Sequence, residues 1–348
     1  MNICDFRVTE EMTLVQAMEI LDKSSKKIVF VVNDGVLLAT MTDGDIRRWI
    51  LSKGNLNALV KDVANYKPKF LYKKDKAKIK DIFSDDGIDA IPIVDISMRL
   101  ESIVFRSDVV VDGEKKLDIP VVIMAGGLGT RLYPYTKILP KPLIPIGDIP
   151  IAEHIINRFR KFKSNDFYII VNHKKNMIKA YFNEIDKEYN LNYMDEDKPL
   201  GTGGGLSLLK NHINSTFILT NCDIIVDEDY TKIYDHHKSE KNIITMVCSL
   251  KNITIPYGVI EVDENGKIKT MKEKPNFSFL TNTGMYIVEP KVIYELDENK
   301  KISFPEIIEK YISNGAKVGI YPISENSWMD MGQLDEMESM RKKLEISE

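Results

Sequence analysis

The sequence predicts an α/β protein with two parts: a repeated α/β region over residues 1–115 and a larger α/β domain with a mainly parallel sheet after residue 118. The first basis for this prediction is an order of helix and strand signals that occurs twice before residue 115. The second is a regular alternation of strand-like and helix-like stretches after residue 118, which is typical of parallel sheets covered by helices. A length of 348 residues leaves room for both parts.

In the first copy of the repeat, a helix is expected at Leu14–Leu21. Strands at Ile28–Val32 and Val36–Met41 follow, connected by a turn at Asn33-Asp34-Gly35. A second helix opens at Thr42–Arg48.

The second copy repeats this order with a helix at Ile79–Phe83 and strands at Ala90–Asp95 and Leu100–Phe105. The charge-rich segment Lys73–Lys80 has no interleaved aromatic residues, so we expect a solvated surface there and not a nucleic-acid contact. The polar stretch Asp112–Lys116 is the expected linker.

The larger domain is expected to place its ligands at the carboxyl ends of its parallel strands. Its predicted strands lie near residues 120–124, 167–171, 217–220 and 243–248, and its predicted helices at 151–163 and 175–187. A further helix carries His236 and His237, which we expect to be an exposed pair because no partner ligands accompany them.

The composition is that of a soluble globular protein, with 43% hydrophobic and 29% charged residues. A net charge of −4 gives no general basic surface, which argues against nucleic acid as a partner. No signal-peptide core and no run of 18 apolar residues occurs, so we expect no membrane association and a cytoplasmic location. Cys4, Cys222 and Cys248 lack metal-ligand spacing and are expected to be reduced thiols.

A glycine-rich turn follows the apolar strand Val121–Ala125. Without side chains, such a turn lets backbone N–H groups close on a polyphosphate, and Arg131 and Lys141 add positive charge nearby. A dinucleotide fingerprint is excluded because Leu132 stands where its third glycine would be. A P-loop is excluded because no Lys-Ser or Lys-Thr pair follows the glycines. The turn therefore predicts a nucleotide site of another kind.

Acidic residues also mark this end of the sheet. The apolar stretch Phe217–Leu219 runs directly into Asp223, and an acid at a strand exit is well placed to hold Mg²⁺. A second candidate ligand is Asp330 in the segment Trp328–Gly332.

The pattern G-G-x-G-T-R-L at 126–132, followed by P-K-P-L at 140–143, resembles the signature of sugar-nucleotide nucleotidyltransferases. The resemblance implies a Rossmann-like catalytic domain over residues 118–348 that transfers a nucleotidyl group from an NTP to a sugar-1-phosphate. The Lys198–Leu206 loop is similar to the family's P-L-G-T-A-G segment, which lies against the nucleoside, with Gly203 in the position of the alanine. The implied nucleotide contacts are Gly126, Gly127, Gly129, Thr130, Gly201 and Thr202.

The same resemblance implies the remaining site residues. Asp223 and Asp330 would coordinate one Mg²⁺, and the catalytic cations would be Arg131, Lys141 and Lys274. Three segments resemble the family's sugar pocket: Y-G-V from Tyr257, E-K-P from Glu273, and N-T-G-x-Y from Asn282. The implied sugar contacts are Gly258, Glu273, Asn282 and Thr283.

The N-terminal repeat resembles a tandem pair of CBS modules, at residues 1–58 and 59–115. Thr42 and Asp45 fit the family's ribose-phosphate motif, which implies an adenine or guanine nucleotide as a ligand. An equally good interpretation is that both residues cap the following helix. In the second module Phe105 replaces the hydroxyl residue while Asp108 keeps its place. Such pairs often self-associate, so a homodimer is expected.

The substrates follow from similarity to subfamilies. The catalytic motifs are most similar to mannose-1-phosphate guanylyltransferases, and the added CBS pair is similar to guanylyltransferases of glucosamine-1-phosphate in legionaminic acid (flagellin glycan) biosynthesis. We therefore expect GTP and glucosamine-1-phosphate. The alternatives are UTP, CTP or dTTP with mannose- or heptose-1-phosphate, or an inactive nucleotide-sensing regulator. The presence of all the metal acids and basic residues argues against the regulator.

Overall fold

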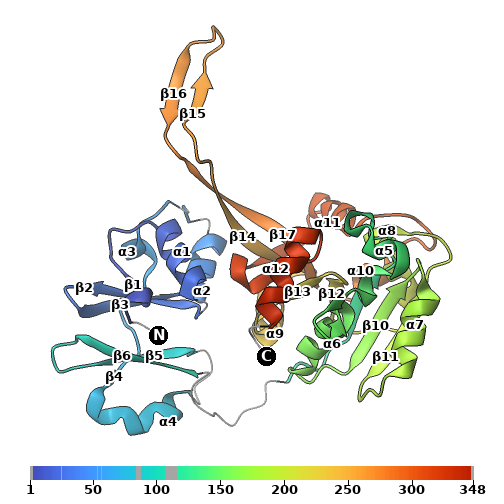
Figure 1. The fold of residues 1–348 in the computed structure, drawn as a ribbon, viewed down its shortest axis with the longest axis horizontal. Coiled ribbons are helices and arrows are strands. Elements are labelled where there is room, and N and C mark those ends of the chain that lie inside the picture. Colours follow the sequence, from blue (N-terminus) through green and yellow to red (C-terminus); the bar gives the residue numbers. More distant parts are fainter. Residues whose placement is uncertain are drawn as a thin grey trace. The chain divides into compact units, whose positions relative to one another are not determined.

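The computed structural model describes residues 3–24, 26–52, 54–55, 57–83, 88–106 and 116–345. The chain folds into two compact units (Figure 1). The first comprises Met1–Gly113, Leu250–Thr281 and Pro322–Asn326, and the second comprises Glu114–Ser249, Asn282–Tyr321 and Ser327–Glu348. Asp108 and residues 112–115 of the expected linker lie outside the described residues.

The N-terminal repeat is confirmed by two three-stranded sheets of the same topology in the first unit. In each, the first two strands are parallel and the last two antiparallel. The first copy consists of β1 (Arg7–Val8), α1 (Leu14–Ser24), β2 (Ile28–Asn33), β3 (Val36–Thr42), α2 (Asp43–Leu51) and α3 (Val60–Val63). The second consists of β4 (Leu71–Tyr72), η2 (Lys73–Lys78), α4 (Ile79–Phe83), β5 (Ala90–Val94) and β6 (Leu100–Phe105).

Strand β2 shows why these sheets stack. Its side chains alternate between the two faces of the sheet, and both faces are buried. Val29 and Val31 pack with α1, whereas Ile28 and Phe30 pack against the second copy in one cluster with Phe105. The apolar residues that predicted this strand therefore pack on one face against α1 and on the other against the second copy of the repeat.

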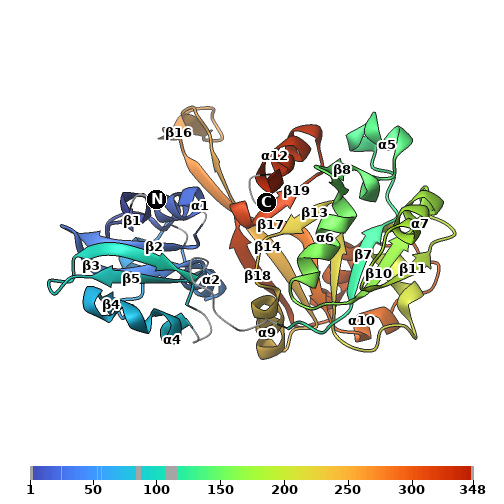
Figure 2. The ribbon, with the colours of Figure 1, turned by 60° about the horizontal axis from the view of Figure 1, so that its bottom comes forward.

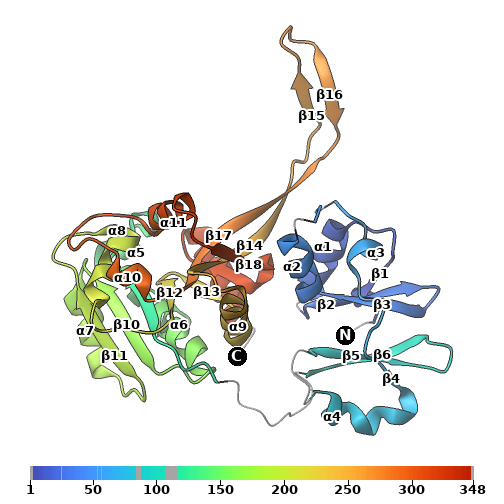
Figure 3. The same ribbon diagram turned by 180° about the vertical axis from the view of Figure 1, so that it is seen from behind.

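The first unit also contains the two-stranded sheet of β15 (Val259–Val262) and β16 (Ile268–Lys272), shown in Figure 3. The strands pair antiparallel, with Val259 opposite Lys272 and a register shift after Glu261.

The second unit contains most of a seven-stranded sheet, and the expected mainly parallel arrangement is confirmed. In spatial order its strands are β11 (Asn190–Asp195), β10 (Asp166–Val171), β7 (Val121–Ala125), β12 (Phe217–Asn221), β17 (Asn276–Val288), β14 (Ile244–Thr254) and β18 (Val318–Ser324). The first four strands run parallel, and β17 pairs antiparallel with β12. The carboxyl ends of β7, β10, β11 and β12 therefore meet at one edge, where the predicted nucleotide loop begins.

Helices cover this sheet; for example, α7 lies beside β10 and β11 (Figures 1 and 2). The helices are α5 (Tyr135–Ile138), α6 (Ile151–Arg160), α7 (Lys175–Glu184), α8 (Gly201–Gly204), α9 (Tyr230–Glu240), α10 (Lys291–Tyr294), α11 (Phe304–Ser313) and α12 (Leu334–Glu345). Short 3-10 turns are η1 (Ile3–Phe6), η4 (Thr130–Leu132), η5 (Lys141–Leu143), η6 (Gly205–Leu209) and η7 (Glu325–Ser327). Small two-stranded sheets pair β8 (Pro145–Ile146) with β9 (Ile149–Pro150), and β13 (Ile224–Val226) with β19 (Trp328–Asp330).

An apolar core covers one face of the sheet. Val122 and Leu219 on the central strands pack in one cluster with Leu206 and Phe304 from the covering segments. Helix α11 begins where it does because Ser303 and Glu306 form a reciprocal capping box.

No helix in the described part of the chain is long and apolar enough to cross a membrane. Cys4, Cys222 and Cys248 are all free thiols, as expected. Burial raises the pKa of Cys222 to about 12, so this thiol stays protonated at neutral pH.

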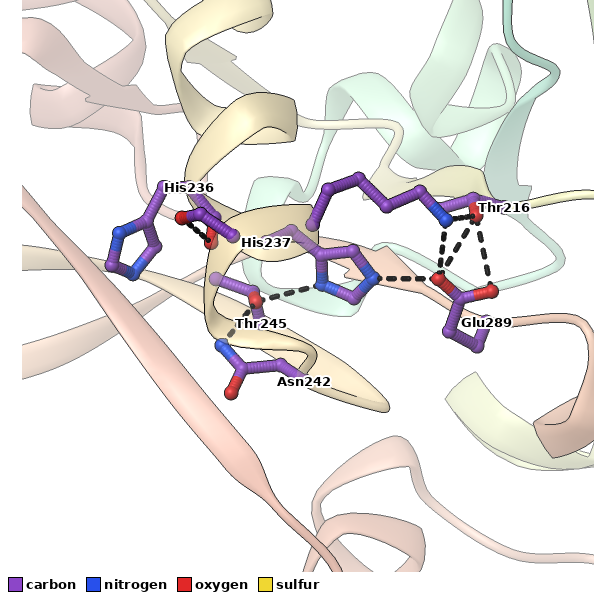
Figure 4. Close-up of polar contacts among 8 residues, drawn as sticks. Thr216, His236, His237, Asn242, Thr245 and Glu289 are labelled. Carbon is purple, nitrogen blue, oxygen red and sulfur yellow. Dashed lines mark hydrogen bonds and ion pairs between the residues drawn. The ribbon is translucent and has the colours of Figure 1, made fainter.

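A buried polar network joins α9 to the sheet (Figure 4). His237 is 0% exposed, with Nδ1 2.8 Å from Thr245 Oγ1 and Nε2 3.1 Å from Glu289 Oε1. Glu289 also accepts hydrogen bonds from Lys238 Nζ and Thr216 Oγ1. The prediction of an exposed histidine pair is therefore wrong for His237, because it follows Tyr230 and Ile233 on the inward face of α9.

We expect His237→Gln to lower the stability at pH 7.5 by about 1–3 kcal/mol, because it disturbs buried hydrogen bonds. Burial lowers the pKa of His237, outweighing the attraction of Glu289. The unfolded chain therefore binds the proton more readily, so this contribution is present above pH 6.5 and is lost as the pH falls below it.

Thermal unfolding of wild type and His237→Gln between pH 5.5 and 7.5 measures this contribution. The difference in melting temperature should shrink as the pH falls. His212→Gln, at an exposed position, is the matched control and should leave the melting temperature unchanged at every pH in this range. A difference that is constant across this range would contradict the assigned titration.

Candidate active site

The glycine loop begins directly after β7, at the carboxyl edge of the sheet. Gly129 has a φ of +66°, which only glycine adopts without strain, and it caps the turn η4. A Cβ here would lie 2.8 Å from Thr136 Cγ2 and 3.3 Å from Lys141 Cβ. Thr136 Oγ1 donates a 2.8 Å hydrogen bond to Gly129 O. The loop is thus packed against the segment that carries Lys141, while a Cβ on Gly127 would meet open space.

The segment that follows the glycine loop is held in place by a lysine located just after strand β10. Lys174 follows β10 and donates from Nζ to the carbonyl oxygens of Thr136, Lys137 and Ile138 at 3.0, 2.6 and 2.9 Å. This lysine therefore caps the C-terminus of α5. Arg131 lies in the turn η4 just before α5, and its side chain is exposed. Sequence reasoning did not single out Lys174, because a lysine after a strand has no distinctive signal.

Two aspartates from distant parts of the chain meet beside Lys141. Asp223 follows β12, and the antiparallel pairing of β13 with β19 sets Ile224 opposite Asp330. The backbone N–H of Met331 donates to Asp223 O at 2.8 Å, which fixes the two strand ends together. Lys141 Nζ forms an ion pair with Asp223 Oδ2, and both side chains are more than four-fifths buried. The structure therefore brings together three of the predicted site residues.

The charges at this position are unevenly compensated. Burial opposes the charge of Lys141, but the attraction of Asp223 and Asp330 outweighs it and raises the Lys141 pKa. Burial, together with repulsion from Asp223 and Glu336, raises the pKa of Asp330 to about 6. Excess negative charge remains around Asp330, and such a place attracts a cation.

The two aspartates fit a divalent cation of the magnesium type. Among the described residues, no group of three or more His, Cys, Asp and Glu side chains is placed to hold a metal ion. Mg²⁺ commonly binds through one or two carboxylates and completes its shell with substrate phosphates and water. Asp223 and Asp330 supply that minimal set.

The predicted nucleoside loop is docked on the start of α11. The backbone N–H groups of Gly203 and Gly204 both donate to Ile302 O at 3.0 Å, and Thr202 Oγ1 accepts from Phe304 N at 3.1 Å. Gly201 has a φ of +79°, and a Cβ there would lie 2.7 Å from Ile302 O. Close packing against Ile302 therefore requires glycine here, independently of the predicted approach of a base.

A buried acid lies between the two glycine segments. Glu196 follows β11 and is 5% exposed, with its backbone N–H donating to Val171 O at 2.9 Å. A Cβ on Gly126 would lie 2.8 Å from Glu196 Oε2, and one on Gly205 would lie 2.6 Å from Oε1. The sequence gives one weak signal for this residue, its place directly after a strand of the sheet.

The predicted sugar segments fall in both units. In the second unit, Thr283 Oγ1 donates to Val247 O at 2.8 Å, so its hydroxyl is committed to the sheet. Asn282 Nδ2 donates to the Tyr286 hydroxyl at 2.6 Å, and its Oδ1 accepts from Gly284 N at 2.9 Å.

In the first unit, the Y-G-V and E-K-P segments meet. A Cβ on Gly258 would lie 3.0 Å from Glu273 Oε2, and Lys274 is exposed with a φ of +44°. The pairing of Val259 with Lys272 brings Gly258 and Glu273 together, and a sugar contact by either residue stays a prediction.

Thr42 and Asp45 form a reciprocal capping box at the start of α2, which confirms their role as helix caps. Thr42 Oγ1 donates to Asp45 Oδ2 at 2.7 Å, and Arg48 Nη2 donates to Asp45 Oδ1. Nucleotide binding by this pair stays a prediction.

A glycine loop, a buried lysine and paired aspartates at one edge of a parallel sheet define a phosphate-handling α/β domain. The family model described as "Nucleotidyl transferase" matches residues 120–346, and the chain belongs to that family. The bifunctional protein GlmU of Methanococcus aeolicus is 36% identical over 221 residues, covering 61% of this chain and 51% of that protein. The mannose-1-phosphate guanyltransferase of Saccharomyces cerevisiae is 32% identical over 228 residues, covering 61% of each. The match spans about half the length of the GlmU relative.

Solved structures share the fold. HddC from Yersinia pseudotuberculosis matches with a TM-score of 0.52 and 22% identity, over 65% of this chain and 99% of that one. The same protein complexed with GMP-PN matches equally, with a TM-score of 0.52 and 21% identity.

Proposed function

We propose that the chain is a sugar-1-phosphate nucleotidyltransferase. The observation that carries this proposal is the convergence of Lys141, Asp223 and Asp330 beside the glycine loop. In the reaction, a phosphate oxygen of the sugar-1-phosphate attacks the α-phosphorus of the NTP. The bond from that phosphorus to the bridging oxygen breaks, and pyrophosphate leaves on the opposite side.

The residues act by positioning and charge neutralisation. Backbone N–H groups of Gly126–Thr130 bind the polyphosphate, Arg131 neutralises the departing pyrophosphate, and Lys141 neutralises the α-phosphate. Lys274 holds the phosphate of the nucleophile. Asp223 and Asp330 would hold Mg²⁺, which would supply positive charge to the reacting phosphates.

We propose GTP and glucosamine-1-phosphate as the substrates, in a legionaminic acid-type glycan route. Support for GTP comes from the guanyltransferases of Saccharomyces cerevisiae and Candida albicans, which are 32% and 31% identical to this chain over the matched regions. The competing choice is UTP, since a Synechocystis UTP–glucose-1-phosphate uridylyltransferase is 30% identical over 234 residues.

For the N-terminal repeat we propose a CBS pair over residues 1–58 and 59–115 that supports a homodimer and takes an adenine or guanine nucleotide. The two sheets of equal topology and the cluster between them support this assignment. A cytoplasmic location, where NTPs are available, fits the same reaction.

The test is pyrophosphate release across five NTPs and several sugar-1-phosphates, with Mg²⁺ and with EDTA. We expect release with one dominant pair of substrates, and a loss of at least a hundredfold when EDTA removes the metal, because the two reacting phosphates then meet with much less positive charge between them. Release that persists in EDTA would contradict the metal assignment. Absence of release with every pair would favour the regulatory alternative.

A further inference from the structure

Residues 253–280 form an arm of the first unit, with the hairpin of β15 and β16 at its end. Figure 3 shows these two strands with no other helix or strand of the described first unit beside them. A two-stranded sheet with nothing packed on it is at best marginally stable in water. A partner surface that covered one face of the hairpin would therefore stabilise it.

The two faces of this hairpin differ in character. The register sets Ile260 opposite Met271 and Val262 opposite Ile268, so these four side chains share one face. Each of them is between 50% and 65% exposed. Residues between them along the strands, such as Glu261, point to the other face. The polar face is suited to water, whereas the apolar face lacks a partner.

The apolar surface continues toward the base of the arm. Tyr257 is exposed, and the half-exposed rings of Phe277 and Phe279 stack with centroids 6.4 Å apart. Nine large apolar side chains from Ile253 to Leu280 are more than a third exposed. Together they present on the order of 900 Å², compared with about 800 Å² that each partner buries in a standard protein interface. The arm therefore has enough apolar surface for a stable protein contact.

The charge of the arm indicates which partner fits. From Tyr257 to Pro275 it carries four acidic residues (Glu261, Asp263, Glu264 and Glu273) and four lysines (Lys267, Lys269, Lys272 and Lys274), so its formal net charge is zero. Anionic lipid surfaces and nucleic acids attract surfaces with surplus basic residues, which the arm lacks. A neutral arm does not repel an identical arm, so a second copy of the chain fits both its charge and its apolar face.

We propose that the apolar face of the arm is a contact between two copies of this chain, each packing the same face on the other. A two-fold symmetric contact of this kind covers both apolar faces at once and closes the assembly. This inference goes beyond the proposed enzymatic function. The contact is also separate from the CBS pair, so a chain that uses both contacts would assemble beyond a dimer.

The test is Ile260→Lys, with the mass of the full chain in solution measured by light scattering after size-exclusion chromatography. Wild type should have at least twice the 39.8 kDa of one chain. Because the substitution places an ammonium group on both apolar faces, the dissociation constant of the contact should rise by about a hundredfold or more. The mass of the assembly should then halve, whether or not the CBS pair also associates.

The matched control is Glu261→Lys, which places the same side chain on the polar face of the same strand and should keep the wild-type mass. A monomeric wild type would overturn the inference, and so would an unchanged mass in Ile260→Lys. None of these measurements needs a substrate, so their outcome is independent of the proposed activity.

A second measurement decides the matter if Ile260→Lys fails to fold. Met271→Cys places a thiol on the apolar face, in a Cys4→Ser background that leaves only the buried Cys222 and Cys248. Its labelling by a maleimide should slow by about tenfold or more as the protein concentration rises through the dissociation constant. Lys272→Cys, on the opposite face, should label at a constant rate. Labelling of Met271→Cys that does not depend on protein concentration, whether fast or slow, would contradict a contact between copies.

Discussion

Replacing Asp223 by asparagine is expected to lower the rate of pyrophosphate release by two to three orders of magnitude. The change removes a proposed metal ligand and also the partner of the Lys141 ion pair. Two phosphates would then approach one another with much less positive charge between them. The fold should persist, because asparagine has the same shape and Asp223 lies at a strand exit and outside the apolar core.

Two measurements make this result specific. The Mg²⁺ concentration for half-maximal rate should rise in Asp223→Asn, which a merely structural defect would not produce. Asp235→Asn, an exposed position on α9, is the matched control and should behave as wild type. A turnover of Asp223→Asn near that of wild type would remove Asp223 from the active site.

Replacing Lys141 by alanine is expected to have a comparable effect, a loss of at least a hundredfold in kcat. Its ammonium group is largely buried and lies beside Asp223 and Asp330, whose attraction keeps it charged. Charge that develops on the α-phosphate in the transition state would then be left uncompensated. The loss should fall mainly on kcat, because the glycine loop still binds the ground-state nucleotide.

Lys161→Ala, at an exposed position after α6, serves as the control and should leave kcat and KM unchanged. A rise in KM at constant kcat in Lys141→Ala would show that Lys141 contributes to ground-state binding only. That outcome would contradict its catalytic role.

The glycine loop and the central strands could be predicted because their signals are local. Five apolar residues before the glycines predict a buried strand and a turn whatever the rest of the chain does. The repeat was predictable for the same reason, since each copy carries its own strands and turns. In the second copy of the ribose-phosphate motif, Phe105 is described and Asp108 lies outside the described residues.

The missed features depend on contacts between distant segments. The meeting of Asp223 and Asp330 was expected from the resemblance, but the pairing of β13 with β19 that produces it was not predicted from either segment alone. Glu196 stands in a polar stretch that looks solvated, and only the fold buries it between two glycines. His237 was predicted to be exposed because a polar pair on a helix usually is, and its hydrogen bonds to Thr245 and Glu289 come from the sheet.

The central claim is that this chain joins a nucleotide to a sugar phosphate by cleaving the bond between the α- and β-phosphates. The most direct measurement is phosphorus NMR of the chain with GTP, glucosamine-1-phosphate and Mg²⁺. We predict that pyrophosphate appears together with the coupled pair of signals of a sugar-linked diphosphate. Orthophosphate and GDP in their place, or unchanged substrates with every NTP and sugar-1-phosphate tried, would contradict the claim.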